Sequence, residues 1–155
     1  MTHCWKLGLV ATLVLGGLLS SAGCGRGNPV ATGVDRETRI RLNILATFYK
    51  EYLDSHRGKP PKDMDSLRQH LQTQADTIEA YKRRNLIGSL QELLTSARDD
   101  QPFVIMFGEK VGLSDMPGAF WIAHEQAGVD GKRMAVRLQG GVDVLDADQF
   151  ARDFE

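Results

Sequence analysis

The thiol of Cys24 has the clearest chemical role in this sequence, because of the residues that precede it. Lys6 is followed by an apolar stretch over residues 7–19, and the small residues 20–23 lead directly to Cys24. A basic start, a short apolar run and small residues before a cleavage point are typical of a secretory signal peptide. The sequence therefore predicts that residues 1–23 are cleaved and that the rest of the chain is exported.

The segment that ends at Cys24 resembles the lipobox of bacterial lipoproteins. Ala22 and Gly23 fit that motif, whereas Ser21 stands where such boxes usually carry Leu. The resemblance implies a diacylglycerol in thioether linkage to the Cys24 sulfur and cleavage between Gly23 and Cys24, with room for a third acyl chain on the new amine. At about 0.8 kcal/mol per buried CH₂, two or three chains hold a protein on a membrane. The expected location is the exported side of the cell envelope, with inner or outer membrane left open.

Two other interpretations of the leader remain. An ordinary secretory signal cut nearby would leave Cys24 without lipid. An uncleaved anchor would keep the leader in the bilayer, although residues 7–19 are fewer than the roughly 20 apolar residues that span one and the run contains Gly16 and Gly17.

Composition limits the kinds of partner and of covalent stabilisation. The chain has 19 Lys and Arg against 20 Asp and Glu, and therefore lacks the basic excess expected of a nucleic-acid-binding protein. Its two cysteines are Cys4, inside the leader, and Cys24. An acylated Cys24 would leave no cysteine for a disulfide, so the exported domain must be stabilised by its core.

The exported chain divides into a tether and one domain. Residues 24–34 are rich in glycine and small polar residues, with one proline, and predict a lipidated tether without a face to bury. Fully stretched, a tether of this length reaches on the order of 30 Å at ~3.5 Å per residue. Residues 35–155 predict a single α+β domain of ordinary size.

The first half of that domain predicts helices. A long amphipathic helix should start at Asp35 and end at His56–Gly58, with Ile40, Ile44, Phe48 and Tyr52 along its apolar face. Asp63 should cap a short helix. Asp76 with Glu79 resembles a capping box for a helix over 75–85, and Ser89 with Glu92 forms a second capping box for a helix that reaches Ala97.

The second half predicts an antiparallel meander. Four strands are expected, namely Phe103–Phe107 buried on both faces, Ala119–Glu125, Lys132–Gln139 after a turn at Asp130–Gly131, and Val142–Val144 after a two-residue hairpin at Gly140–Gly141. A closing helix over Asp146–Phe154 follows. Helices first and strands afterwards predict an α+β fold in which the long helix packs on one sheet face.

These segments resemble the globular half of type IV pilins and type II secretion pseudopilins, and more closely a group of uncharacterised bacterial envelope proteins with that pilin-like domain. The resemblance covers roughly residues 36–155. It is carried by Leu45–Tyr52 with Gly58–Pro61, by Ser96–Val104, by Asp130–Arg133 and by the hairpin at Gly140–Gly141. These motifs are structural, and the resemblance implies a pilin-like fold and no reaction.

Two departures argue against a filament subunit. True prepilins keep their apolar segment after cleavage and carry a glutamate at the fifth position after a glycine cut site. A cut after Gly8 would place Leu13 there, and the apolar run precedes Cys24, so lipoprotein processing would discard it. The expectation is a pilin-like domain anchored by lipid.

Other side chains with chemical potential have simpler interpretations. His56 suits a helix end, His70 a solvated helix face and His124 a strand exterior, and no pair has metal-ligand spacing. Asp143, Asp146 and Asp148 could bind calcium, as oxygen clusters do, but Asp146 equally suits an N-cap. Asp99, Asp100 and Asp115 are interpreted as turn formers rather than as an acid–base pair.

Two surface features have a structural and a binding interpretation. Lys82, Arg83 and Arg84 are either a solvated helix face or a basic patch for phospholipid headgroups. Phe120 and Trp121 should point to opposite faces of a strand, so one is core and the other either anchors a partner or is covered by the closing helix.

The sequence predicts no enzyme, cofactor or metal site, because no nucleophile, base or ligand set is recognisable. The expected function is that of a structural or interaction module of the envelope, with membrane lipid bound through Cys24 and an envelope protein as partner, near a secretion or pilus-like assembly. The alternative is a small lipoprotein that binds a ligand or ion at the loop Gly108–Gly118.

Overall fold

The computed structural model describes residues 33–108 and 120–154. The elements in chain order are α1 (Gly33–Ser55), α2 (Met64–Thr73), α3 (Ala75–Arg83), α4 (Leu90–Leu93), β1 (Val104–Ile105), β2 (Trp121–His124), β3 (Arg133–Arg137), β4 (Val142–Leu145) and α5 (Ala147–Phe154). The strands pair in the order β1-β2-β3-β4, all antiparallel. The fold is therefore α+β, with the long helix followed by a four-stranded meander, as predicted.

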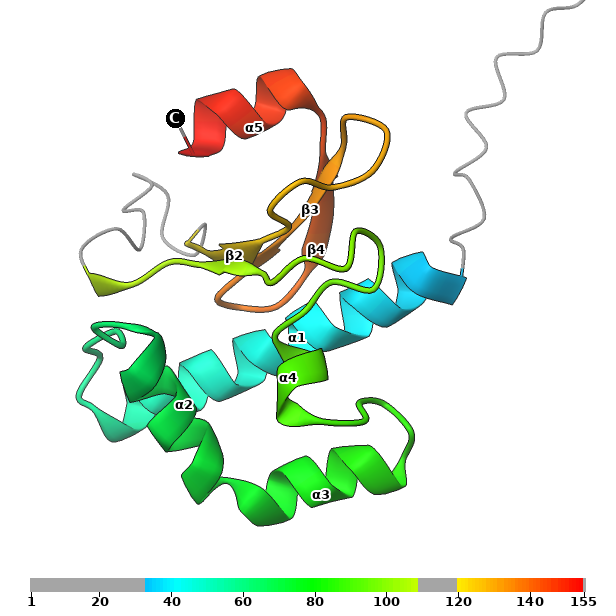
Figure 1. Ribbon diagram of the computed structural model, residues 1–155. Coiled ribbons are helices and arrows are strands. Elements are labelled where there is room, and N and C mark those ends of the chain that lie inside the picture. Colours follow the sequence, from blue (N-terminus) through cyan, green and yellow to red (C-terminus); the bar gives the residue numbers. More distant parts are fainter. Residues whose placement is uncertain (1–32, 109–119, 155) are drawn as a thin grey trace, which may run out of the picture.

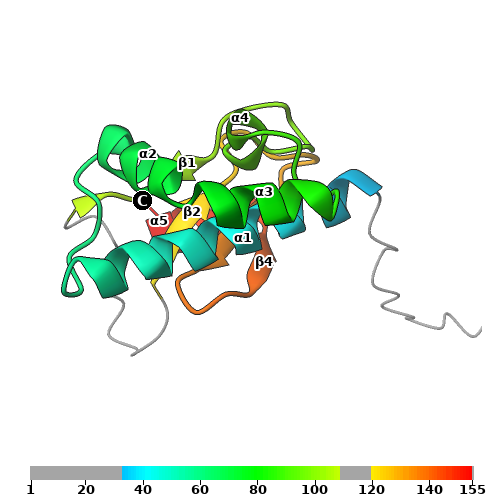
Figure 2. The same ribbon diagram turned by 90° about the horizontal axis from the view of Figure 1, so that it is seen from below.

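The sheet lies between helices on both of its faces. Figure 1 shows α1 crossing one face and α5 lying on the other, while Figure 2 shows α2 and α3 beside α1. Strand β3 is covered on both faces. Met134 and Val136 belong to the core beneath α1, and Ala135 belongs to a second cluster with Leu145 and Phe150. The sequence predicted α1 on one face and left open whether the closing helix covers the other or leaves it to a partner.

The long helix α1 buries the apolar face that the spacing of its residues predicts. Leu42, Leu45, Phe48 and Tyr49 are fully buried on one face, and the Tyr49 hydroxyl donates a 2.8 Å hydrogen bond to the carbonyl of Met106 beside the sheet. The helix ends where Arg57 and Gly58 adopt positive φ angles of 58° and 78°. The Gly58 N–H then donates to the Leu53 carbonyl at 2.8 Å, a last-turn acceptor that also receives the His56 N–H at 3.2 Å.

Two helix predictions need correction. Ser89 does cap α4, since its Oγ accepts from the Glu92 N–H at 3.1 Å, but the helix stops at Leu93 because the Ser96 N–H pairs with the Gln101 carbonyl at 2.9 Å. The predicted capping box of Asp76 and Glu79 is wrong: α3 has no side-chain cap, and Glu79 pairs instead with Lys82 at 2.6 Å.

Two strand predictions also need correction. Strand β1 has only two residues, and Val104 is 36% exposed, so this segment is buried on one face rather than two. The β3–β4 connection is longer than two residues, because the strands end at Arg137 and resume at Val142. The Gly140 N–H donates to the Arg137 carbonyl at 2.9 Å, and the Arg137 N–H donates to the Gly141 carbonyl at 3.3 Å.

The turn at Asp130–Gly131 is confirmed. Both residues have positive φ angles, 52° and 70°, as a type I′ turn requires. Val129 and Lys132 exchange backbone hydrogen bonds across it, at 2.9 and 3.0 Å. None of the described helices is long and apolar enough to cross a bilayer.

Candidate functional site

The predicted lipidation site, Cys24, lies outside the described residues, and the part of the structure that bears on it is the start of α1 at Gly33. The residues between the two cover at most on the order of 30 Å at ~3.5 Å per residue. The surface around the first turns of α1 is therefore the part of the domain whose distance from Cys24 is limited most tightly.

A surface groove lies beside those first turns, between α1, the turn at residues 129–132, the edge strand β4 and the start of α5. We call it the β4 groove. Its lining includes Val34, Asp35, Arg39, Arg98, Val129, Asp130, Lys132, Met134, Val142, Asp143, Val144, Asp146 and Gln149. Val34 is 46% exposed and Val144 is 37% exposed, and Val104 on β1 is the third exposed large apolar side chain of the described residues. Two of the three therefore flank this groove.

The outer edge of β4 is half protected by side chains of α1. Arg39 donates from Nη1 to the Val142 carbonyl at 2.7 Å, and Asn43 accepts from the Gly141 N–H at 3.4 Å. Because Arg137 and Gly141 form a hydrogen-bonded pair, alternation along the ladder makes Met134 and Val144 a non-hydrogen-bonded pair. The N–H and C=O of Val144 therefore point outward from the sheet edge, next to the groove.

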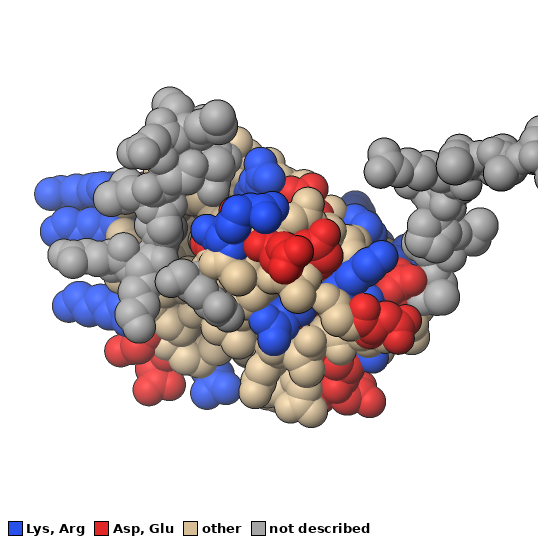
Figure 3. All heavy atoms as spheres, turned by 90° about the horizontal axis from the view of Figure 1, so that it is seen from above, with Lys and Arg blue, Asp and Glu red and all other residues tan. Residues whose placement is uncertain are grey.

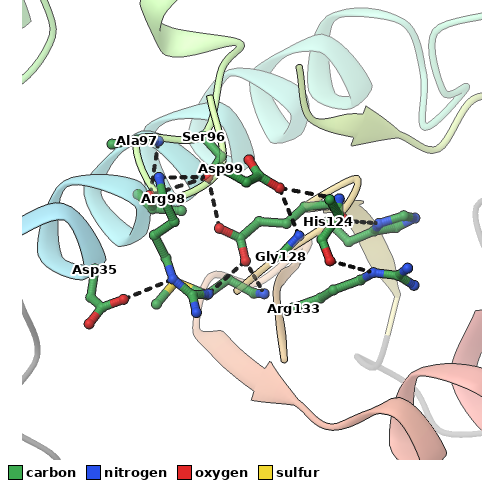
Figure 4. Close-up of polar contacts among 12 residues, drawn as sticks. Asp35, Ser96, Ala97, Arg98, Asp99, His124, Gly128 and Arg133 are labelled. Carbon is green, nitrogen blue, oxygen red and sulfur yellow. Dashed lines mark hydrogen bonds and ion pairs between the residues drawn. The ribbon is translucent and has the colours of Figure 1, made fainter. Parts of the chain in front are cut away.

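A buried carboxylate, Glu125, directly follows β2, and two of its partners, Ser96 and Arg98, are labelled in Figure 4. Its side chain is fully buried. Its Oε1 accepts from the Ser96 hydroxyl at 2.7 Å, and its Oε2 accepts from Arg98 Nη1 at 2.6 Å and from the Met134 N–H at 2.7 Å. Burial raises the pKa of the Glu125 carboxyl, and the hydrogen bonds from Met134 and Ser96 and the charge of Arg98 oppose that rise.

Arg98 extends this network to the start of α1. Its Nε donates to the Asp35 carboxylate at 2.8 Å, so one guanidinium bridges the first turn of α1 and the end of β2. The Ala97 N–H donates to the Thr38 hydroxyl at 3.1 Å, close by. These contacts fix the position of α1's first turns, and every polar group named in them has a partner inside the domain.

Asp99, next to Arg98, joins its own turn to the turn that follows β2. Its Oδ2 accepts from the N–H groups of Ala127 and Gly128, and its Oδ1 accepts from the Gln101 N–H. Burial raises the pKa of Asp99, but the hydrogen bonds from Gly128, Gln101 and Ala127 outweigh it and hold that pKa below its usual value. Asp99 is thus a turn former, as predicted, and it also joins two turns.

Only one of the three histidine predictions is confirmed. His56 does serve a helix end, since its ring stacks on Tyr52 and its Nδ1 lies 2.8 Å from the Tyr52 carbonyl. His70 is partly buried rather than solvated, with its ring edge-on to Tyr52, and burial lowers its pKa.

His124 is buried rather than on a strand exterior. It is only 8% exposed, because α5 covers that face and packs Phe150 and Phe154 against its ring. Burial lowers the pKa of His124, and its Nδ1 lies 2.7 Å from the Glu125 carbonyl.

The predicted acidic cluster is divided among local contacts. Asp146 accepts from the Gln149 N–H at 2.8 Å and so caps α5, while Asp143 pairs with Arg137 at 2.9 Å. Asp148 lies in the first turn of α5. In residues 33–108 and 120–154, no group of three His, Cys, Asp or Glu side chains is arranged to hold a metal ion.

Of the remaining candidate residues, some are described by the structure and others are not. Trp121 packs against Phe154, with the Arg137 guanidinium 4.5 Å from its ring centre, so the closing helix covers it. Phe120 is partly buried. Asp115 and all of the loop Gly108–Gly118 except its first residue lie outside the described residues.

Comparison with known proteins adds no relative: no family model matches the chain, and no curated protein or solved structure matches it.

Proposed function

We propose that this protein is an envelope lipoprotein, anchored by acyl chains on Cys24, whose α+β domain is an interaction module for another envelope protein. The leader, the small residues before Cys24 and the tether support the anchor. The observation that carries the interaction role is the β4 groove, because it combines exposed valines, the outward backbone groups of Val144 on a strand edge and the end of α1 that is joined to the tether.

We further propose that the domain is a pilin-like one used away from a filament. A long helix laid across a four-stranded antiparallel meander supports that likeness. Removal of the leader would take away the apolar segment with which pilins pack their filament. The lipid would then supply placement, and the domain surface would supply contact with the partner, near a secretion or pilus-like assembly.

The β4 groove favours an extended segment of the partner. Such a segment pairs with the outward N–H and C=O of Val144 and rests apolar side chains on Val34 and Val144. The rim carries Lys132 and Arg39 as well as Asp130, Asp143 and Asp146, and therefore suits a partner with charges of both signs.

The test places a photo-crosslinking amino acid at Val144 and, as a matched control, at Val104. The two residues are valines of similar exposure on the two opposite edge strands. In intact cells the residue at 144 should give one discrete protein adduct that the residue at 104 does not give. Adducts of the same pattern at both positions, or none at 144, would contradict the interaction role. Loss of the adduct in Cys24→Ser would show that it depends on the anchor.

A further inference from the structure

A second groove lies at the same end of the domain, on the other side of α1. It is lined by α1 residues Gly33, Arg36, Glu37 and Ile40, by the segment Asn85–Gly88 that follows α3, and by Glu92. Figures 1 and 2 both place the carboxyl end of α3 at the same end of the domain as the first turns of α1. The last basic residues of the α3 region, Arg83 and Arg84, therefore lie at the end of the domain that is joined to the tether.

Three arginines at this end of the domain are exposed and unpaired among the described residues. Arg36, Arg83 and Arg84 are all exposed, and within the described part of the chain their side chains make no ion pair or side-chain hydrogen bond. Lys82, by contrast, is paired with Glu79.

The carboxylates near these arginines are occupied. Glu37 and Glu92 both accept from the Nη2 atom of the buried Arg41, and Glu92 also accepts from the Gly88 N–H at 2.8 Å. Asp35 is bound to Arg98. The three arginines therefore keep a net positive charge at the surface, available to an anionic group from outside the domain.

We propose that Arg36, Arg83 and Arg84 bind the phosphates of anionic phospholipid headgroups, so that the domain stands end-on with α1 rising from the membrane. This proposal rests on the lipid anchor of the preceding subsection. The tether limits the distance between this end and the bilayer, and guanidinium groups bind phosphate through paired N–H donors. Contact then places the β4 groove, which lies at the same end of α1, close to the membrane surface.

The opposite end of α1 provides an internal comparison. Arg57, Lys59 and Lys62 are also exposed and unpaired within the described residues, and Figure 3 shows Lys and Arg side chains projecting from the end where α1 terminates. The length of α1, about 1.5 Å per residue, keeps this second basic cluster on the order of 30 Å further from the anchor. At that distance the electrostatic attraction between this cluster and the membrane is largely screened, since the Debye length is about 8 Å at physiological salt.

The test uses the mature lipidated protein in vesicles of phosphatidylcholine alone or mixed with phosphatidylglycerol. Because the sequence has no cysteine after Cys24, a single fluorescent label can be attached through Val34→Cys at one end of α1 or through Asp54→Cys at the other. A nitroxide on the lipid headgroup quenches a label that lies at the membrane surface. The proposal predicts that phosphatidylglycerol increases quenching at position 34 and not at position 54, and that high salt reverses the increase.

Two charge-matched triple variants decide the question. At about fivefold in binding per basic residue near an anionic surface, the change Arg36, Arg83 and Arg84→Gln should lower the ratio of docked to undocked domain on the order of 100-fold. The change Arg57, Lys59 and Lys62→Gln should leave quenching at position 34 unchanged. Circular dichroism verifies that both variants are folded.

Equal quenching in both lipid mixtures, or equal loss in both triple variants, would overturn the headgroup contact. The intact mass of the same preparation separates this failure from that of the anchor. If the protein is acylated but quenching does not depend on the lipid, the anchor stands and only the headgroup contact is refuted. If Cys24 is not acylated, both the anchor and the contact are refuted.

Discussion

The two halves of α1 are held to the rest of the domain by different kinds of contact. In the second half, which we take to begin at Leu42, the residues Leu42, Leu45, Phe48 and Tyr49 are fully buried among apolar side chains. In the first half, Asp35, Thr38 and Arg41 bond to the segment around residues 92–98.

This difference separates stability from placement. Burial of large apolar side chains contributes most of the free energy of folding and has little directional preference. Buried hydrogen-bonded ion pairs contribute less net free energy, because desolvation offsets much of their attraction, but they accept only one geometry. The polar half lies at the end joined to the tether and beside both grooves, so the position of the candidate binding surfaces depends on it.

The largest expected effect comes from the apolar half. Phe48→Ala should lower the free energy of unfolding by about 3–5 kcal/mol, because it opens a cavity between α1 and its neighbours. Denaturant unfolding monitored by circular dichroism measures this change. A loss below about 1 kcal/mol would mean that this face of α1 is not the core.

A smaller effect is expected from the buried carboxylate. Glu125→Gln keeps the shape of the side chain but removes its charge. The amide N–H then faces the Met134 N–H or Arg98, which are donors too, so the free energy of unfolding should fall by about 1–3 kcal/mol. Hydrogen exchange should rise first in the early turns of α1, around Asp35, and not around Phe48. The control Glu79→Gln removes an exposed pair and should cost less than about 0.5 kcal/mol. Uniform exchange along α1 would contradict the division into two halves.

The bond between α1 and the edge of β4 should contribute less again. Arg39→Gln removes the donor to the Val142 carbonyl at a partly exposed site, for an expected loss of about 0.5–1.5 kcal/mol. Chemical denaturation measures it against Arg68→Gln, an exposed arginine without a bond among the described residues, which should leave stability unchanged. Equal effects of the two substitutions would show that Arg39 does not protect the edge.

The smallest expected effect is a dependence on pH. Because burial lowers the pKa of His124, the unfolded chain takes up a proton more readily than the folded one below the ordinary value of 6.5. Stability should therefore fall as the pH drops from 7 toward 5. His124→Phe, which fits beside Phe150 and Phe154, should flatten this dependence. The part that remains should be the balance of His70, which acts in the same direction, and Glu125, whose raised pKa acts in the opposite one. An unchanged slope in chemical denaturation over this range would show that His124 does not contribute.

The sequence predicted the apolar half of the domain well and the polar half poorly. Apolar residues four apart located α1, and alternation with turn residues located the sheet, because these patterns depend only on which face is buried. The two-sided burial of β3 was missed, since it depends on where α5 packs. The short extent of β1 was missed because it depends on how far β1 pairs with β2, its one neighbour in the sheet. The covered position of His124 has the same cause.

The buried network could have been found in part. Thr38 and Arg41 occupy positions of α1 that are in phase with Leu45 and Phe48, and a polar residue at a core position implies a buried partner. The partners, Ser96, Arg98 and Glu125, are distant in sequence, and no local pattern pairs them. The grooves were likewise unpredictable, because elements separated along the chain form their walls.

Both binding surfaces derive their proposed role from the lipid anchor, so the intact mass of the protein purified from detergent-solubilised envelope is the most direct test. The predicted mass is that of residues 24–155 plus a diacylglyceryl group on the sulfur, with or without one further acyl chain. A free thiol at Cys24, or a chain that still carries residues 1–23, would contradict the anchor and the placement of both surfaces beside a membrane.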